Sequence, residues 1–262
     1  MRFDLVTLFP DLFGGFLSEA LLAKALARGV IRVTLTNPRD FAPDRHHTCD
    51  DRPYGGGPGM VLKPEPLARA IEAASAGRPR PWRVCLTPSG LRLNQAKVRE
   101  LLDRRRLLII CGRYEGLDQR IIDLLVDEEI SIGDYVVNGG EVPAMVLMEA
   151  VARLVPGFMG QAGSAEEESH QAGLLEYPHY TRPPSFRGLK APSVLLSGHH
   201  QAVARWRLSA ALAKTLDRRP EMLAAAGLDP AARTALAALN RPETPPSVAK
   251  PDLVQTTNQG RG

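Results

Sequence analysis

The sequence predicts an α/β fold built on a largely parallel sheet and followed by a small, all-helical C-terminal domain. Two observations carry this prediction. Strand-like and helix-like runs alternate up to about residue 155, and the composition changes after a glycine-rich stretch at 156–173. Strands that alternate with helices are typical of parallel sheets covered by helices. With 262 residues, of which 44% are hydrophobic, the chain has the length and composition of one large or two smaller globular domains.

Five apolar, β-branched runs are the predicted strands. They cover residues 4–9, 31–36, 83–87, 107–111 and 130–137. Helical spacing of apolar residues lies between and after them, at 17–27, 66–74, 94–104, 118–126 and 141–154. The run 107–111 reads Leu-Leu-Ile-Ile-Cys without interruption. A strand of this kind is expected to be buried on both faces of the sheet.

The second domain follows a linker. We expect a first domain at 1–160, the linker at 161–173 and helices at 199–216, 221–226 and 231–239 within a domain that spans 174–242. Residues 243–262 are polar and rich in proline, and we expect them to be disordered.

The net charge of +4 is unevenly distributed along the chain. Acidic side chains outnumber basic ones by two over residues 1–169, whereas basic ones exceed acidic ones by five over 170–245. A basic segment beside a near-neutral domain favours a polyanionic partner, with an ordinary solvated surface as the alternative. No segment reaches the roughly 18 apolar residues of a membrane helix. The three cysteines form no CxxC pair, so we expect reduced thiols and a cytoplasmic protein.

Glycine-containing loops follow the predicted strands. One of them, 44–60, has four glycines between Gly55 and Gly59, and three others lie at 85–90, 111–116 and 131–141. The carboxyl ends of parallel strands meet at one edge of a sheet, which predicts a small-molecule cleft there. The three later loops are poor in lysine and contain apolar side chains, which suits a purine-bearing ligand better than a triphosphate. Neither a P-loop, a GxGxxG fingerprint nor a zinc-ligand spacing is present.

Five segments, in this order and spacing, resemble the bacterial tRNA (guanine-N(1))-methyltransferases of the SPOUT class. They read DRPYGGGPGM, CGRYEG, SIGDYVVNGGE, GLLEYPHYTRP and VLLSGHH, and the resemblance extends from Met1 to about residue 240. It implies a parallel sheet with a deep trefoil knot, a helical tRNA-binding domain and an obligate homodimer whose active sites are shared between subunits. The implied reaction moves a methyl group from S-adenosylmethionine to N(1) of the guanosine immediately 3′ of the tRNA anticodon (position 37), supported by Mg²⁺ at a site that the motifs do not identify.

The resemblance also assigns residues to S-adenosylmethionine. They are Leu86, Thr87, Pro88, Gly112, Tyr114, Glu115, Ile132, Gly133, Asp134, Tyr135, Val136, Val137, Gly139, Gly140 and Pro143. The glycine-rich loop from Asp50 is expected to close over the substrate, while Arg182, Arg205 and Arg207 are expected to contact tRNA phosphates. Trp206, between two of these arginines, is either a stacking platform for a base or, more commonly for a helical tryptophan, part of a core.

The catalytic residues implied are Arg153, which contacts the target guanine, and a general base in the linker. Relatives usually have aspartate there, whereas this chain has glutamate, and alignment on Ser164 and Ser169 selects Glu168, with Glu166 and Glu167 as alternatives. Guanine N(1) carries a proton at neutral pH, so a base must remove it as the methyl group arrives. Arg153 would stabilise the negative charge that develops on the neighbouring carbonyl oxygen.

Two other functions remain open on the sequence. A SPOUT ribose 2′-O-methyltransferase would use the same cofactor loops, but the linker carboxylates argue against it. A non-catalytic RNA-binding protein would explain the missing aspartate, but the cofactor motifs are all intact.

Overall fold

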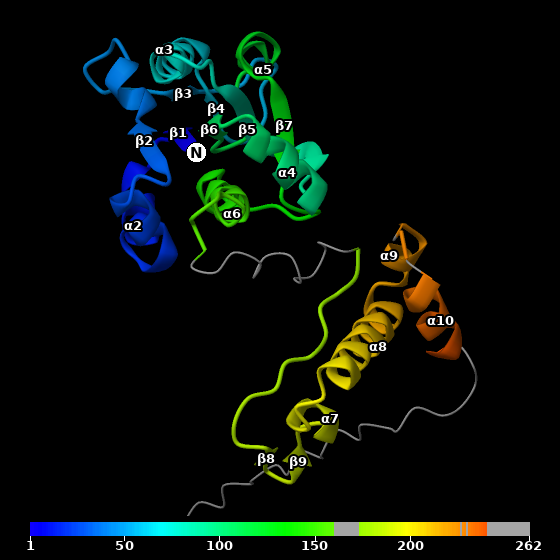
Figure 1. Ribbon diagram of the computed structural model, residues 1–262. Helices are drawn as coiled ribbons and strands as arrows, with labels where there is room; N and C mark the ends of the chain where they lie inside the picture. Colours follow the sequence, from blue (N-terminus) through cyan, green and yellow to red (C-terminus); the bar gives the residue numbers. More distant parts are fainter. Residues whose placement is uncertain (160–172, 226, 229, 240–262) are drawn as a thin grey trace, which may run out of the picture. The chain divides into compact units, whose positions relative to one another are not determined.

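The computed structural model describes residues 1–159, 173–225, 227–228 and 230–239 (Figure 1). The chain divides into two compact units, with the division between Gln171 and Ala172. Each unit is described below by itself.

The first unit is built on a five-stranded, fully parallel sheet in the order β2-β1-β6-β5-β7. Its strands are β1 (Arg2–Val6), β2 (Arg32–Thr36), β5 (Trp82–Arg92), β6 (Arg106–Cys111) and β7 (Glu128–Ser131). Its helices are α1 (Gly14–Ser18), α2 (Ala20–Ala27), α3 (Pro64–Ser75), α4 (Gln95–Asp103), α5 (Gln119–Leu125) and α6 (Glu141–Ala152), with short 3-10 turns at Pro10–Phe13 and Pro38–Phe41. The predicted alternation of strands and helices is therefore confirmed.

Strand β6 divides two hydrophobic cores, one on each face of the sheet. Leu107 and Ile109 point into a core shared with α2, α4 and α6, whereas Leu108 and Ile110 point into a core shared with α3 and α5. Figure 1 shows α3 and α5 on one side of the sheet and α2 and α6 on the other. All six residues of β6 are buried, as the uninterrupted apolar run predicts. At about 1.5–3 kcal/mol for each large apolar side chain buried, this strand is central to the stability of the unit.

The strand predicted at 83–87 extends to Arg92 in β5. Two other predicted boundaries are wrong for local reasons. The strand predicted at 130–137 ends at Ser131, because Ser131 Oγ hydrogen-bonds to the backbone of Gly133 and turns the chain out of the sheet. The single helix predicted at 17–27 is interrupted after Ser18, because Glu19 is extended and Ala20 has a φ of 53°. Neither conformation is visible in a hydrophobic periodicity.

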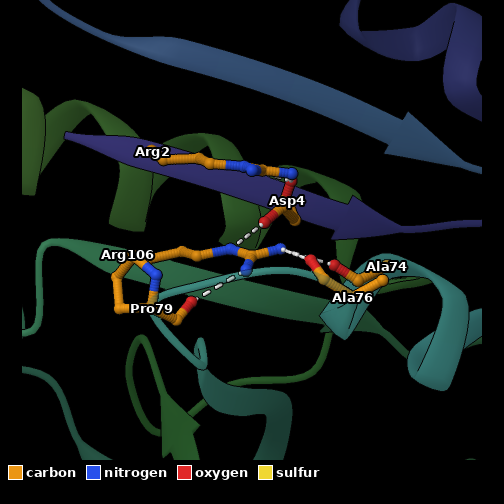
Figure 2. A network of polar contacts seen from close by, with 6 residues as sticks. All are labelled: Arg2, Asp4, Ala74, Ala76, Pro79 and Arg106. Carbon is orange, nitrogen blue, oxygen red and sulfur yellow. Dashed lines mark hydrogen bonds and ion pairs between the residues drawn. The ribbon is translucent and has the colours of Figure 1, made fainter.

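A buried ion pair closes the amino-terminal edge of the sheet (Figure 2). Arg106 is 1% exposed, and its Nε donates to Asp4 Oδ2 at 2.8 Å. Its remaining donors reach the backbone carbonyls of Ala74, Ala76 and Pro79 at 2.8–3.1 Å. Arg2 contacts the other oxygen of Asp4. This network ties the segment after α3 to the first residues of β1 and β6.

The second unit is mostly helical, with α7 (Ser193–Leu196), α8 (His200–Arg218), α9 (Pro220–Ala225) and α10 (Pro230–Leu239). It is not all-helical as predicted, since β8 (Ser185–Phe186) and β9 (Leu189–Lys190) form a short hairpin. The two residues between them, Arg187 and Gly188, both have positive φ, which is the geometry of a tight two-residue hairpin turn. Among the described residues, no helix is long and apolar enough to cross a membrane.

Candidate functional site

A cavity of about 390 Å³ lies at the carboxyl ends of β6 and β7 and at an irregularity within β5. Its wall comes from this part of β5, from the loops that follow β6 and β7, and from Pro143 at the start of α6. In β5 the pairing with β7 is interrupted between Leu86 and Leu91, and residues 87–89 leave the ladder to line the cavity. The cleft expected at the carboxyl edge of the sheet is therefore present.

The structure brings together all the predicted cofactor residues except Asp134. Those that line the cavity are Leu86, Thr87, Pro88, Gly112, Tyr114, Glu115, Ile132, Gly133, Tyr135, Val136, Val137, Gly139, Gly140 and Pro143. The side chain of Asp134 is 84% exposed and pairs with Arg92 at 3.2 Å outside the lining. The sequence motif placed Asp134 in the right loop, but the turn at Gly133 directs its side chain to the surface.

Gly140 explains how the third loop reaches β6. A Cβ at position 140 would lie 2.6 Å from Cys111 Cα, so only glycine allows this approach of two backbones. The Gly140 amide donates to Gly112 O at 2.8 Å, and Gly139 bridges Arg113. The loop therefore returns from β7, across the end of β5, to the end of β6.

Several cavity residues were missed by sequence reasoning. Ser89, Arg113, Gln119, Glu129 and Asn138 also line the cavity. Arg113 lies within the motif CGRYEG, so a charged side chain in a glycine-containing loop could have identified it as a cavity residue. The ion pair of Arg113 with Glu141, at 2.9 Å, joins residues of two different motifs, and spacing alone could not have paired them.

The cysteines near the cavity are not reactive groups. Burial raises the pKa of the Cys85 thiol to about 12, and it raises the pKa of Cys111 well above its usual value. Both side chains are therefore neutral thiols at physiological pH, and neither is suited to nucleophilic chemistry. All three cysteines, including Cys49, are free and buried, in agreement with the expectation of reduced thiols.

The glycine-rich loop is connected to one wall of the cavity. Its last residue, Met60, accepts a hydrogen bond from the Glu115 amide at 3.0 Å, and Leu62 donates to Gly116 O. Asp50 lies in β3 (Asp50–Asp51), which pairs with β4 (Val61–Leu62) at the base of this loop. Asp50 does not line the cavity itself. The tip of the loop is open to solvent, since Tyr54 is 98% exposed.

Of the two predicted catalytic residues, the structure describes only Arg153. Arg153 caps the carboxyl end of α6 and is half-buried, and it does not contribute to the cavity lining. Glu168, together with Glu166 and Glu167, lies outside the described residues. Within the described part of the chain, no group of three or more His, Cys, Asp or Glu side chains is arranged to hold a metal ion.

The predicted tRNA contacts lie in the second unit. Arg182, Arg205 and Arg207 are exposed, and the Arg207 guanidinium stacks 4.9 Å from the centre of the Tyr177 ring. Trp206 is half-buried and meets Tyr180 edge-on, with ring centres 6.2 Å apart. This contact favours the core role of Trp206 over the stacking role.

A parallel α/β sheet with glycine loops around a cavity at its carboxyl edge is the arrangement typical of α/β proteins that bind nucleotide-like ligands. The sequence of residues 1–225 matches the protein-family model described as tRNA (Guanine-1)-methyltransferase TrmD. The chain belongs to this family.

Several relatives are similar to the chain over most of its length. The tRNA (guanine-N(1)-)-methyltransferase of Geobacter sulfurreducens is 51% identical over 245 residues, which cover 94% of this chain and 100% of the relative. The protein of the same name from Geotalea uraniireducens is 53% identical over 92% of this chain and 98% of the relative. The protein of that name from Pelotomaculum thermopropionicum is 53% identical over 87% of this chain and 92% of the relative.

Proposed function

We propose that the protein is a tRNA (guanine-N(1))-methyltransferase that moves a methyl group from S-adenosylmethionine to the guanosine at position 37, immediately 3′ of the anticodon. The observation that carries this proposal is the cavity beside β5 and at the ends of β6 and β7, around which the family's cofactor motifs converge. Membership of the family supports the reaction, and the basic second unit supports an RNA substrate.

The cavity residues fit S-adenosylmethionine. Its volume of about 390 Å³ is within the range of roughly 300–1,000 Å³ of small-molecule sites. Leu86, Ile132 and Val137 offer apolar surface for an adenine ring. When bound, this ligand supplies an electrophilic methyl group.

Proton removal is assigned to Glu168 and charge stabilisation to Arg153. A carboxylate is a suitable group to accept the N(1) proton as the methyl group arrives. Glutamate is one methylene longer than the aspartate usual in relatives, so the reach of the base toward N(1) differs. Arg153 would hold the developing negative charge on the guanine oxygen.

The tRNA would be held by phosphate contacts from Arg182, Arg205 and Arg207, while the glycine-rich loop from Asp50 closes over the extruded base. Phosphate contacts position an RNA without reading its sequence. A base that is to be modified must leave its stack. The proposal therefore assigns residues 1–160 to catalysis, 161–173 to the linker that carries the base, and 174–242 to tRNA binding.

A trefoil knot, a homodimer with shared active sites, Mg²⁺ and a cytoplasmic location complete the proposal. Support for a knot comes from the path of the chain after β7, which returns across β5 to reach β6 before α6 enters the core. The homodimer with shared active sites is proposed from the family resemblance, and Arg153 lies outside the cavity lining of the described residues.

The test is methyl transfer to tRNA transcripts that differ only at position 37. Labelled S-adenosylmethionine should give labelled 1-methylguanosine after digestion to nucleosides, and a transcript with adenosine at position 37 should give none. Label in a 2′-O-methyl nucleoside would identify a ribose methyltransferase instead. Binding of tRNA without transfer at any Mg²⁺ concentration would identify a non-catalytic RNA-binding protein.

A further inference from the structure

The loop from Ile132 to Gly139 supplies much of the cavity wall but has few anchors in its middle. Tyr135 is 58% exposed and Val136 is 82% exposed. One end is held by Ser131, whose Oγ donates to Gly133 O at 3.0 Å and accepts from the Gly133 amide at 3.2 Å. The shape of the loop therefore depends on what holds the other end.

Arg113 holds that other end. Its backbone forms an antiparallel bridge with Gly139, and its guanidinium donates to Asn138 O at 3.4 Å. The guanidinium lies 4.5 Å from the centre of the Phe9 ring, which fixes its plane. A Cβ at position 139 would overlap the Arg113 side chain, so the loop is packed directly against it.

Glu141 in turn fixes Arg113. Glu141 is 1% exposed, and its Oε2 lies 2.9 Å from Arg113 Nε. Its Oε1 accepts a hydrogen bond from Thr7 Oγ1 at 2.8 Å, and Thr7 Oγ1 accepts one from the Phe9 amide at 2.9 Å. A carboxylate buried to this degree is costly unless it is paired. The contact with Arg113 is an ion pair without hydrogen-bond geometry, and it keeps the charged arginine beside the carboxylate.

We propose that Arg113 and Glu141 are positioning residues that hold the loop 132–140 in the shape that receives the cofactor. The two residues act as one unit. Thr7, directly after β1, fixes Glu141. Glu141 fixes Arg113, and Arg113 in turn fixes the loop. Neither residue is required to touch the reacting atoms. The inference rests on the proposed function for the identity of the ligand, S-adenosylmethionine.

The experiment compares Arg113→Met, Glu141→Gln and the double variant with Arg92→Met. Arg92 is the matched control, because it pairs with Asp134 of the same loop through an exposed contact at 3.2 Å. By calorimetry, each single variant should bind S-adenosylmethionine and S-adenosylhomocysteine about tenfold more weakly. The double variant should bind the cofactor no more weakly than the single variant with the lower affinity, because the two residues act together. Arg92→Met should bind as the unaltered protein does.

Two further readouts separate positioning from general damage. In Arg113→Met without ligand, the amides of 132–140 should exchange hydrogen faster, while those of β6 keep their protection. In steady-state assays KM for S-adenosylmethionine should rise, while kcat at saturating cofactor and KM for tRNA stay within about twofold. Additive losses in the double variant, unchanged exchange in the loop, or a fall in kcat with intact cofactor affinity would each overturn the proposal.

Thr7→Val is the milder variant if a charge substitution fails to fold. It keeps both charges and removes the hydroxyl that donates to Glu141 and accepts from the Phe9 amide. Cofactor binding should weaken by about threefold, and affinity equal to that of the unaltered protein counts against the proposal. If the unaltered protein does not bind S-adenosylmethionine, the proposed function fails. The exchange measurement on the ligand-free variants still decides whether Arg113 holds the loop.

Discussion

Single atoms decide the shape of the cavity. The backbone of Gly140 touches that of Cys111 with no room for a methyl group, and Ser131 turns the chain through one hydroxyl. Of the residues that the motifs assigned to the cofactor, all but Asp134 line the cavity, but other lining residues such as Arg113 and Asn138 were not assigned. They could not predict that Arg113 pairs with Glu141, or that Glu141 accepts a hydrogen bond from Thr7, because these residues lie far apart in the sequence and meet only in the folded unit.

Gly140→Ala should damage the cavity. The added Cβ would meet the backbone of Cys111, which cannot move without displacing β6, so we expect a loss of about 1–3 kcal/mol in the free energy of unfolding. Affinity for S-adenosylmethionine should fall as well. Thermal unfolding and calorimetry measure the two effects. Gly15→Ala is the control, because a Cβ added at position 15 would meet nothing within 4 Å; equal behaviour of the two variants would show that the close approach is not needed.

Glu168→Gln should abolish methyl transfer and leave affinity for S-adenosylmethionine nearly unchanged. The amide cannot accept the N(1) proton, and the residue is not among those assigned to the cofactor. Single-turnover transfer to tRNA and calorimetry are the measurements, with Glu167→Gln as the neighbouring control. If Glu167→Gln is the inactive variant instead, the base is displaced by one position along the linker.

Helices and strands were the features most directly predicted from the sequence. The apolar run of β6 predicted a strand buried on both faces, and the structure confirms it. Boundaries failed where a single backbone angle interrupts a pattern, as at Ala20. The hairpin of β8 and β9 was missed because two residues per strand leave no periodicity to detect.

Arg106→Met should destabilise the first unit strongly. It leaves Asp4 without its buried partner and three carbonyls without a donor, so the free energy of unfolding should fall by about 3–5 kcal/mol. Urea unfolding followed by the fluorescence of Trp82, in a Trp206→Phe background, reports this unit. Arg69→Met breaks only an exposed pair with Glu65 and should cost less than about 1 kcal/mol. A similar small loss for Arg106→Met would show that the network is dispensable.

The molecule as a whole joins a sheet-based unit to a basic helical one. The unequal charge along the chain was visible in the sequence, and so was the change of character near the linker. A knot could not be predicted from periodicity, because the same strands and helices fit an unthreaded chain equally well. The linker that would carry the base lies outside the described residues, so the complete catalytic group stays a prediction.

Arg205→Gln should weaken tRNA binding without affecting the cofactor. The loss of one phosphate contact should lower the slope of log affinity against log salt by about 0.7–0.9. Filter binding over a range of salt concentrations measures the slope, and calorimetry should give unchanged affinity for S-adenosylmethionine. Arg69→Gln, which removes a basic charge from the first unit, should leave the slope unchanged. An unaltered slope in Arg205→Gln would remove this residue from the RNA contacts.

The contact between Gly139 and Arg113 has a consequence for the history of the family. A side chain at position 139 would need the space that the arginine fills, and a shorter residue at 113 would leave that space empty. The two positions are therefore expected to covary. Where an alignment of relatives shows a larger residue at 139, it should show a smaller one at 113. Without a cation at 113, a neutral residue is expected in place of Glu141.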